Sequence, residues 1–178
     1  MKEFFDLYDV ERHPLGRTHE RGLPMAKDEY HLVVACWTIN SKGQILITHR
    51  DAVKKSYPST WENTCGCAQA GEDSIAAIIR EMREETGIHA DGSAFTLLGT
   101  STECHAFIDT YLLDRDVELC DIVLQEGETD DVRWVYADDI DALIEDGTFA
   151  YPVVVRLAPL RAALNKILAP RTNRLFKL

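Results

Sequence analysis

Three glutamates, Glu81, Glu84 and Glu85, lie close together in the segment GCAQAGEDSIAAIIREMREETGI, which runs from Gly66 to Ile88. On a helix, at about 100° per residue, their carboxylates fall within an arc of roughly 100°. Like charges at this spacing repel one another, and the negative end of the helix dipole adds to the cost. A bound divalent cation offsets both terms, and Mg²⁺ or Mn²⁺ takes oxygen ligands of this kind. The alternative is a solvated helix face whose glutamates pair with Arg80 and Arg83.

The sequence also predicts the helix that must position these carboxylates. It begins at about Asp73 or Ser74 and ends at Gly87, the residue expected in the left-handed conformation after the last turn. A Gly-rich turn containing Gly66 and Gly71 is expected before it. One face is apolar at helical spacing and should pack on a sheet, with Ile75, Ile78, Ile79 and Met82 as its members.

The segment resembles the Nudix box, G-x5-E-x7-R-E-U-x-E-E-x-G-U, in which U is an aliphatic residue. All of the specified positions are met, by Gly66, Glu72, Arg80, Glu81, Met82, Glu84, Glu85, Gly87 and Ile88. The resemblance implies an α/β fold of the Nudix type, an α-β-α sandwich with a mixed β-sheet between helices. It implies hydrolysis of a diphosphate linked to another moiety, with Mg²⁺ held by Glu81, Glu84, Glu85 and the backbone carbonyl of Gly66.

Further roles follow from the same resemblance. Arg80 is expected to orient a glutamate, and Glu72 to support the loop and the helix start by hydrogen bonds. Besides Glu84 and Glu81, a catalytic carboxylate is expected from a later loop. Glu128, in the acidic stretch from Gln125 to Asp131, is the first candidate for this base and Glu126 the second. An acidic surface loop without a catalytic role is the alternative.

The composition favours one globular domain and limits its partners. The chain has 178 residues, 46% of them hydrophobic, which suits a single domain over residues 1–178. The net charge of −11 argues against nucleic acid or an anionic membrane as a partner, because both need a basic surface. Five cysteines argue against a disulfide framework, and the acidic N-terminus is unlike a signal peptide. We therefore expect a cytoplasmic protein whose ligand is a small diphosphate.

Strand and helix patterns alternate along the chain. Residues 1–30 are expected to be an irregular N-terminal extension with a short strand at 4–10, and they are candidate material for a homodimer contact. Strands are predicted at 31–39, 44–49, 95–104, 106–113 and 132–136, the first two forming a hairpin with a four-residue loop. Helices are predicted at 138–145 and 153–168, the second crossed by Pro159. The basic C-terminal end is expected on the surface. This alternation favours one mixed sheet covered on both sides.

The loop RDAVKKSYPST, after the predicted hairpin, is the most basic stretch before the acidic helix. The candidate substrate-binding residues are Arg50, Lys54, Lys55, Tyr57 and Trp61. The alternative is an ordinary solvated loop. Tyr57, Trp61 and Trp134 are expected either to stack on a nucleobase or to pack in the core.

A second resemblance extends from His31 to Gly66, which is similar to isopentenyl-diphosphate isomerase, a Nudix-fold enzyme that moves a double bond with a Cys and a Glu. Cys65 matches the catalytic cysteine, His31 matches a metal ligand, and Asp109 aligns with an acid of the later strand. Cys67 and Phe107 stand where the isomerase has two other ligands. Because the hydrolase carboxylates are intact, we expect a hydrolase from the isomerase-like branch, with isomerisation through Cys65 as the alternative.

Two other hypotheses remain open from the sequence. Cys65 and Cys67 with His105 or His31 would suit zinc, although buried structural thiols are the commoner outcome. A non-catalytic binding module on the same fold would have no need of the intact carboxylates. The loops name no base, sugar or alcohol, so the identity of the substrate is not predicted.

Overall fold

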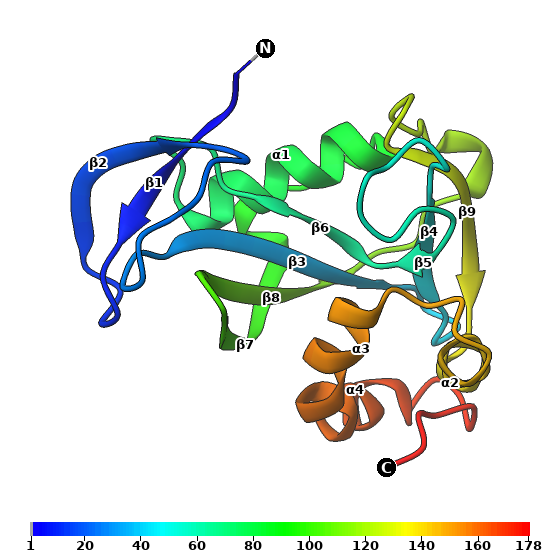
Figure 1. Ribbon diagram of the computed structural model, residues 1–178. Coiled ribbons are helices and arrows are strands. Elements are labelled where there is room, and N and C mark those ends of the chain that lie inside the picture. The colour runs from blue at the N-terminus through cyan, green and yellow to red at the C-terminus, as the bar shows by residue number, and fades with distance from the viewer. Residues whose placement is uncertain (1) are drawn as a thin grey trace.

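The computed structural model describes residues 2–178, which form strands and helices in alternation (Figure 1). The strands are β1 (Phe4–Tyr8), β2 (Pro14–Glu20), β3 (His31–Ile39), β4 (Ile45–Arg50), β5 (Trp61–Glu62), β6 (Thr64–Cys67), β7 (Phe95–Glu103), β8 (Ala106–Asp114) and β9 (Thr129–Val135). The α-helices are α1 (Ser74–Thr86), α2 (Ala137–Glu145), α3 (Tyr151–Leu157) and α4 (Arg161–Leu168). Short 3₁₀ turns are η1 (Gly92–Ala94), η2 (Leu119–Asp121) and η3 (Ala158–Leu160).

A mixed sheet is the centre of the fold. Its strands follow the order β5-β4-β3-β8-β7, while β6 pairs with β3 and β9 pairs with β4. Strands β3 and β8 are parallel, and the other pairs of this sheet are antiparallel. The mixed sheet predicted from the sequence is therefore confirmed.

The predicted hairpin is present only at its closed end. Strands β3 and β4 pair at Ile39 and Ile45, and the strands then diverge. Beyond this point, residues Val33 to Cys36 of β3 pair with β6 along the same edge of the strand, whereas β4 pairs with β5 and β9. This divergence places β6 next to α1, where the acidic residues lie.

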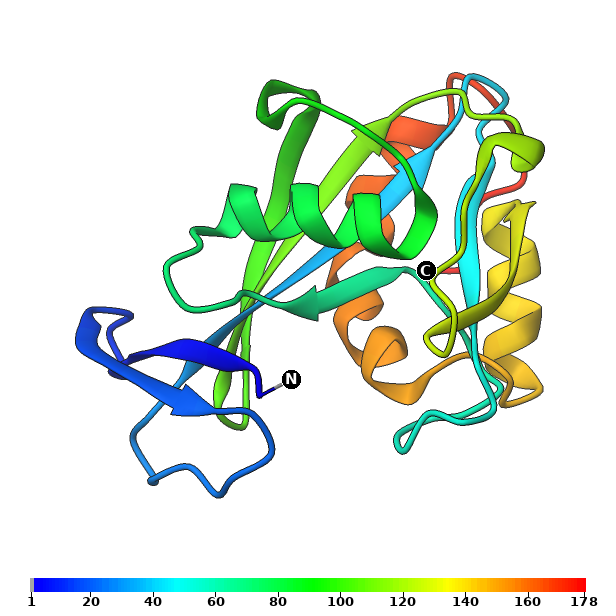
Figure 2. The ribbon, with the colours of Figure 1, turned by 90° about the horizontal axis from the view of Figure 1, so that it is seen from above.

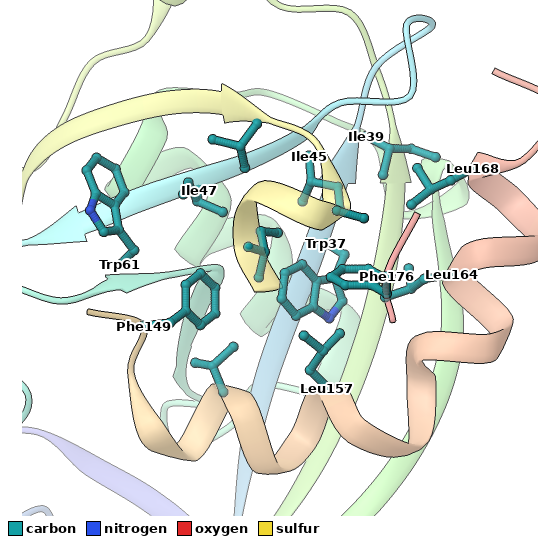
Figure 3. Packing of buried hydrophobic residues seen from close by; sticks show 14 of the residues in the cluster. Trp37, Ile39, Ile45, Ile47, Trp61, Phe149, Leu157, Leu164, Leu168 and Phe176 are labelled. Atoms are coloured by element: carbon teal, nitrogen blue, oxygen red, sulfur yellow. The ribbon is translucent and has the colours of Figure 1, made fainter. Parts of the chain in front are cut away.

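Helices cover both faces of the sheet (Figures 1 and 2). On one face α1 contributes Ile78 and Met82, both fully buried, to a cluster with alternate residues of β3 and β8. On the other face α2, α3 and α4 pack around Trp37, which is 1% exposed (Figure 3). Alternate residues of β3 thus point to opposite cores, as expected for a sheet buried on both sides.

The N-terminal extension is regular where an irregular segment was predicted. Strands β1 and β2 form a two-stranded antiparallel sheet, and β1 matches the short strand expected at 4–10. Tyr8 and Tyr30 exchange two backbone hydrogen bonds, which join this hairpin to the segment that leads into β3. The extension therefore packs on its own chain.

The C-terminal end was also predicted incorrectly in part. The expected helix at 153–168 is divided into α3, η3 and α4, with Pro159 in η3. Phe176, in the end expected on the surface, is 3% exposed and packs in the core beside Trp37 (Figure 3). The Asn165 side chain of α4 accepts a hydrogen bond from the Phe176 N–H and donates one to the Phe176 carbonyl, each at 2.9 Å. These bonds fix the last residues against the helix.

Within residues 2–178, no helix combines the length and the apolar character needed to cross a bilayer. The five cysteines are free thiols, and Cys36 is the one of them that is fully buried.

Candidate active site

Helix α1 presents the glutamates because both its ends and its apolar face are fixed. The Asp73 carboxylate accepts a hydrogen bond from the Ala76 N–H at 2.8 Å, and Gly87 ends the helix with φ of 70°. Ile78 and Met82 are anchored in the core, and Glu81 and Glu84, on an adjacent side of the helix, lie toward strand β6. The helix and its bounds agree with the sequence prediction.

Gly66 lies in strand β6 where a turn was predicted, and the strand passes very close to the helix at this residue. A Cβ atom at this position would lie 2.0 Å from the carboxyl carbon and from Oε1 of Glu81. Only glycine leaves room for that carboxylate above the backbone. The Glu81 carboxylate is thereby held directly over the strand.

Arg80 holds the neighbouring carboxylates in place. Its guanidinium donates to Glu72 at 2.8 and 2.9 Å, to Glu81 at 2.9 Å, to Glu84 at 3.0 Å and to the Cys67 carbonyl at 2.9 Å. Burial alone would lower the pKa of Arg80, but the carboxylates of Glu72 and Glu81 raise it overall. Glu72 also accepts from the Gln69 N–H at 2.8 Å and so ties the loop to the helix.

Glu85 is the most confined acid of the group. It is 8% exposed, and its Oε2 has no hydrogen-bond partner among residues 2–178. Burial raises the pKa of Glu85 well above its usual value, and repulsion from Glu62, Glu81 and Glu128 raises it further. A buried oxygen without a partner costs about 1–3 kcal/mol, and a cation would remove this cost.

Glu62 was missed by the sequence analysis. It lies on β5 and is 7% exposed, and burial raises its pKa although the Arg50 guanidinium, at 2.6 Å, acts in the opposite direction. The carboxylate reaches the group through the pairing of β4 with β5. No pattern in the sequence around Trp61 indicates this pairing.

A cavity of about 130 Å³ lies beside these carboxylates. It is lined by Glu3, Phe4, Phe5, Arg21, Arg50, Lys54, Cys65, Gly66, Cys67, Ala68, Gln69, Arg80, Glu81, Glu84, Glu85, Gln125 and Glu128. Lys54 and Glu128, which both line it, form an ion pair. Glu126 is exposed and is not among the lining residues.

Most of the expected substrate-binding residues either bind other protein groups or lie outside this cavity. Arg50 binds Glu62 and the backbone carbonyls of Ser56 and Tyr57. Tyr57 lines a second cavity of about 160 Å³, and Lys55 is exposed and lines neither cavity.

The two tryptophans considered as stacking surfaces pack in or against the core. Trp61 is 6% exposed in the core, with the Arg133 guanidinium 3.6 Å from its ring centroid. Trp134 is half-buried, and its indole N–H donates to the Val117 carbonyl at 3.0 Å. Neither ring lines the cavity.

Two residues of the isomerase alternative lie on opposite faces of the sheet. Cys65 pairs with Ala35, whereas Asp109 pairs with Val34, and adjacent residues of a strand point to opposite faces. Asp109 binds Arg12, Ser74 and Thr100 under α1, while the Arg156 guanidinium contacts the Cys65 sulfur at 3.3 Å on the other side. Burial raises the pKa of Cys65 to about 12. The structure therefore does not bring this pair together.

A zinc site is not supported either. Within residues 2–178, no three His, Cys, Asp or Glu side chains are grouped closely enough to hold a metal as they stand, and this holds for the glutamates of α1 as well. His31 stacks on Phe5 with ring centroids 4.4 Å apart, and burial lowers its pKa to about 4. His105 Nδ1 lies 2.9 Å from the Glu29 carbonyl.

A cation at the acidic helix would have to replace Arg80 as the partner of the Glu81 and Glu84 carboxylates. The donor set is made of carboxylate oxygens, which suits a hard divalent ion, and Glu85, whose Oε2 has no partner, lines the same cavity. Glu81 and Glu84 would exchange contacts with Arg80 for contacts with the ion. On these grounds the residues present fit a divalent cation.

Fold and site together define a class of α/β proteins in which a helix rich in glutamate borders a cavity beside a mixed sheet. The model of the NUDIX domain matches residues 29–157. The chain belongs to the NUDIX domain family, which confirms the resemblance noted in the sequence.

Relatives extend this finding. A Listeria monocytogenes protein named as an uncharacterized Nudix hydrolase is 36% identical over 148 residues, covering 83% of this chain and 88% of its own length. The isopentenyl-diphosphate Delta-isomerase of Citrobacter koseri is 39% identical over 83 residues, covering 46% of this chain and 46% of its own. The isomerase likeness is thus confined to part of the chain.

Solved structures share the fold. The DR0079 protein of Deinococcus radiodurans has a TM-score of 0.69 at 24% identity, covering 83% of this chain and 92% of that chain. A Francisella tularensis NMN adenylyltransferase/ADP ribose pyrophosphatase, complexed with AMP and a manganese ion, has a TM-score of 0.57 at 17% identity, covering 76% and 42%.

Proposed function

We propose that the chain hydrolyses a diphosphate linkage in a nucleoside diphosphate derivative or a similar small diphosphate, with Mg²⁺ as cofactor and Mn²⁺ as the alternative ion. The observation that carries this proposal is the buried, partnerless Oε2 of Glu85 at a cavity that Glu81, Glu84 and Glu128 also line. A divalent cation would satisfy this oxygen and would admit phosphate groups to an acidic cavity.

Glu81, Glu84, Glu85 and the backbone carbonyl of Gly66 are the residues that would hold the ion. When bound, it would neutralise charge that develops on the phosphate oxygens as water attacks phosphorus. Arg80 would keep Glu72 and the loop before α1 in place while Glu81 and Glu84 turn toward the cavity. This division of roles follows from the contacts of the guanidinium.

Glu128 is the proposed general base. Its carboxylate lines the cavity and would take the proton from the attacking water. Lys54 pairs with this carboxylate and lines the same cavity, so its ammonium would both orient the base and contact a phosphate oxygen. Glu84 and Glu81 would act in catalysis through the ion that they hold.

Release of phosphate, pyrophosphate or a nucleotide from a panel of substrates tests the proposal. The panel contains nucleoside diphosphates, dinucleotides, nucleotide sugars and coenzyme A derivatives, each with Mg²⁺. Glu85→Gln is expected to lower kcat/KM on the order of 100-fold, because a ligand worth several kcal/mol is lost. Glu118→Gln, which removes the same charge from an exposed residue outside the cavity, should leave turnover unchanged. Absence of Mg²⁺-dependent cleavage across the panel would refute the proposal.

We also propose the setting in which the chain acts. Residues 1–178 would form one domain, because the β1–β2 hairpin and Phe176 pack on the region that the family match covers. Free thiols suit the cytoplasm. The ligand would be a small diphosphate, without nucleic acid or membrane. A homodimer formed through residues 1–30 would be detected by sedimentation equilibrium.

A further inference from the structure

The β1–β2 hairpin forms one wall of the cavity. Glu3, Phe4, Phe5 and Arg21, at the open end of the hairpin, line it together with the glutamates of α1. These residues precede the family match at residues 29–157. Whatever the hairpin contributes therefore comes from outside the matched NUDIX domain.

The hairpin is fixed to the site and cannot swing freely away from it. The Ala70 N–H donates to the Phe4 carbonyl at 2.8 Å, and the Gly71 N–H donates to the Asp6 carboxylate at 2.8 Å. Figure 2 shows the hairpin beside the loop that leads into α1. At its other end, the Arg12 guanidinium binds both oxygens of buried Asp109, at 2.8 and 2.5 Å. Side chains at the open end are thus held beside the carboxylates.

Four cationic side chains line the cavity, and three of them are firmly engaged. Arg80 and Arg50, whose side chains are 12% and 17% exposed, each bind buried or half-buried carboxylates and backbone carbonyls. Lys54, 20% exposed, is paired with Glu128. Arg21 differs, because its side chain is 56% exposed and its guanidinium is paired at 2.6 Å with Glu3, whose side chain is 52% exposed.

An ion pair as exposed as that of Arg21 and Glu3 contributes little to stability, typically about 0–1 kcal/mol. It can therefore be exchanged at small cost for a contact with another anion. A phosphate carries more negative charge than a carboxylate and accepts the two parallel hydrogen bonds that a guanidinium donates. Arg50 and Arg80 would have to give up buried or half-buried partners to do the same, and Lys54 is already paired with the proposed base.

We propose that Arg21 is a phosphate-binding residue of this site and that Glu3 is the anion that a substrate phosphate displaces from it. This role rests on the proposed function, because the phosphate concerned belongs to the diphosphate bound beside Glu81 and Glu85. The hairpin then supplies one wall of the substrate site. The class of ligand is a diphosphate with one phosphate at the glutamate helix and the other at Arg21.

The test measures binding of inorganic pyrophosphate with Mg²⁺ by titration calorimetry, so it does not depend on turnover. Arg21→Gln is expected to weaken binding about tenfold, the usual scale for loss of one charge-assisted contact at a partly exposed site. Glu3→Gln removes the competing anion and is expected to tighten binding about threefold. If the ion pair only stabilised the hairpin, the two substitutions would change the affinity for pyrophosphate in the same direction.

Arg17→Gln is the matched control. Arg17 lies on β2, four residues before Arg21, is 58% exposed and pairs with Glu29, but it is not among the residues that line the cavity. It should bind pyrophosphate as the wild type does. Wild-type affinity in Arg21→Gln, or no binding of pyrophosphate by the wild-type chain, would overturn the assignment. Binding that depends on Arg21 in a chain that cleaves no substrate would instead refute the proposed hydrolysis and leave the assignment standing.

Discussion

Replacing Gly66 by alanine tests how closely strand β6 approaches helix α1. The new Cβ would lie 2.0 Å from the carboxyl carbon and Oε1 of Glu81 and 2.5 Å from Oε2. Ordinary contacts between such atoms are about 3.5–4.0 Å, so the carboxylate must swing away. Glu81 then loses its 2.9 Å bond to Arg80 as well as its place at the cavity. We expect a loss of stability of about 1–2 kcal/mol, since a charge-assisted hydrogen bond is broken.

For a chain of this size, the loss corresponds to a fall in Tm of roughly 2–8 °C, measured by differential scanning calorimetry. The effect on kcat/KM should be much larger, on the order of 100-fold, and similar to that of Glu81→Ala. The double variant should be no worse than either single one, because both act on the same carboxylate. Gly99→Ala is the control, since its Cβ would meet only Leu160 Cδ2 at an ordinary 3.5 Å. Wild-type turnover in Gly66→Ala, or losses that multiply in the double variant, would refute this account.

Three further predictions concern the base, the hairpin anchor and a buried histidine. Glu128→Gln should lower kcat far more than it weakens Mg²⁺ binding, as seen by comparing turnover with calorimetry, and unchanged turnover would remove Glu128 from the mechanism. Asp109→Asn should cost about 2–3 kcal/mol in chemical denaturation and speed hydrogen exchange in β1 and β2, because Arg12 loses a buried partner; an unchanged exchange rate would contradict the anchoring role. Burial lowers the pKa of His31 to about 4, so as the pH falls the unfolded chain takes up the proton before the folded chain does. The contribution of His31 to the free energy of unfolding is therefore fully present above about pH 6.5 and is lost as the pH falls toward 4. Because the side chain is partly exposed, the loss is at most about 2–3 kcal/mol. His31→Phe should flatten this part of the pH–stability curve.

The sequence was most informative where local chemistry determines structure. Asp73 and Gly87 mark the ends of α1 because a cap and a left-handed residue are local requirements, and the apolar spacing of Ile78 and Met82 identifies the buried face. The same segment carried the family resemblance that the domain match confirmed. The separate strands at 95–104 and 106–113 were also within one or two residues of those observed.

Long-range pairing explains what the sequence did not reveal. Glu62 joins the acidic group only because β5 pairs with β4, and Arg21 reaches the cavity only because the β1–β2 hairpin folds against the loop before α1. Gly66 looked like part of a turn, since its strand, β6, is short and is formed by pairing with β3. Phe176 follows a basic, surface-like stretch, and its burial depends on Asn165 in the preceding helix and on Trp37, far away in the sequence. None of these contacts has a local signature.

The partnerless oxygen of Glu85 indicates that selection at this position has not been for stability alone. A buried acid with an unsatisfied atom makes the native state less stable than an apolar side chain of similar volume would. Mutation and selection for stability alone would replace it. Its presence marks a position at which conformational stability has been given up for activity. Substitutions that make the protein more stable but inactive are expected at this position first.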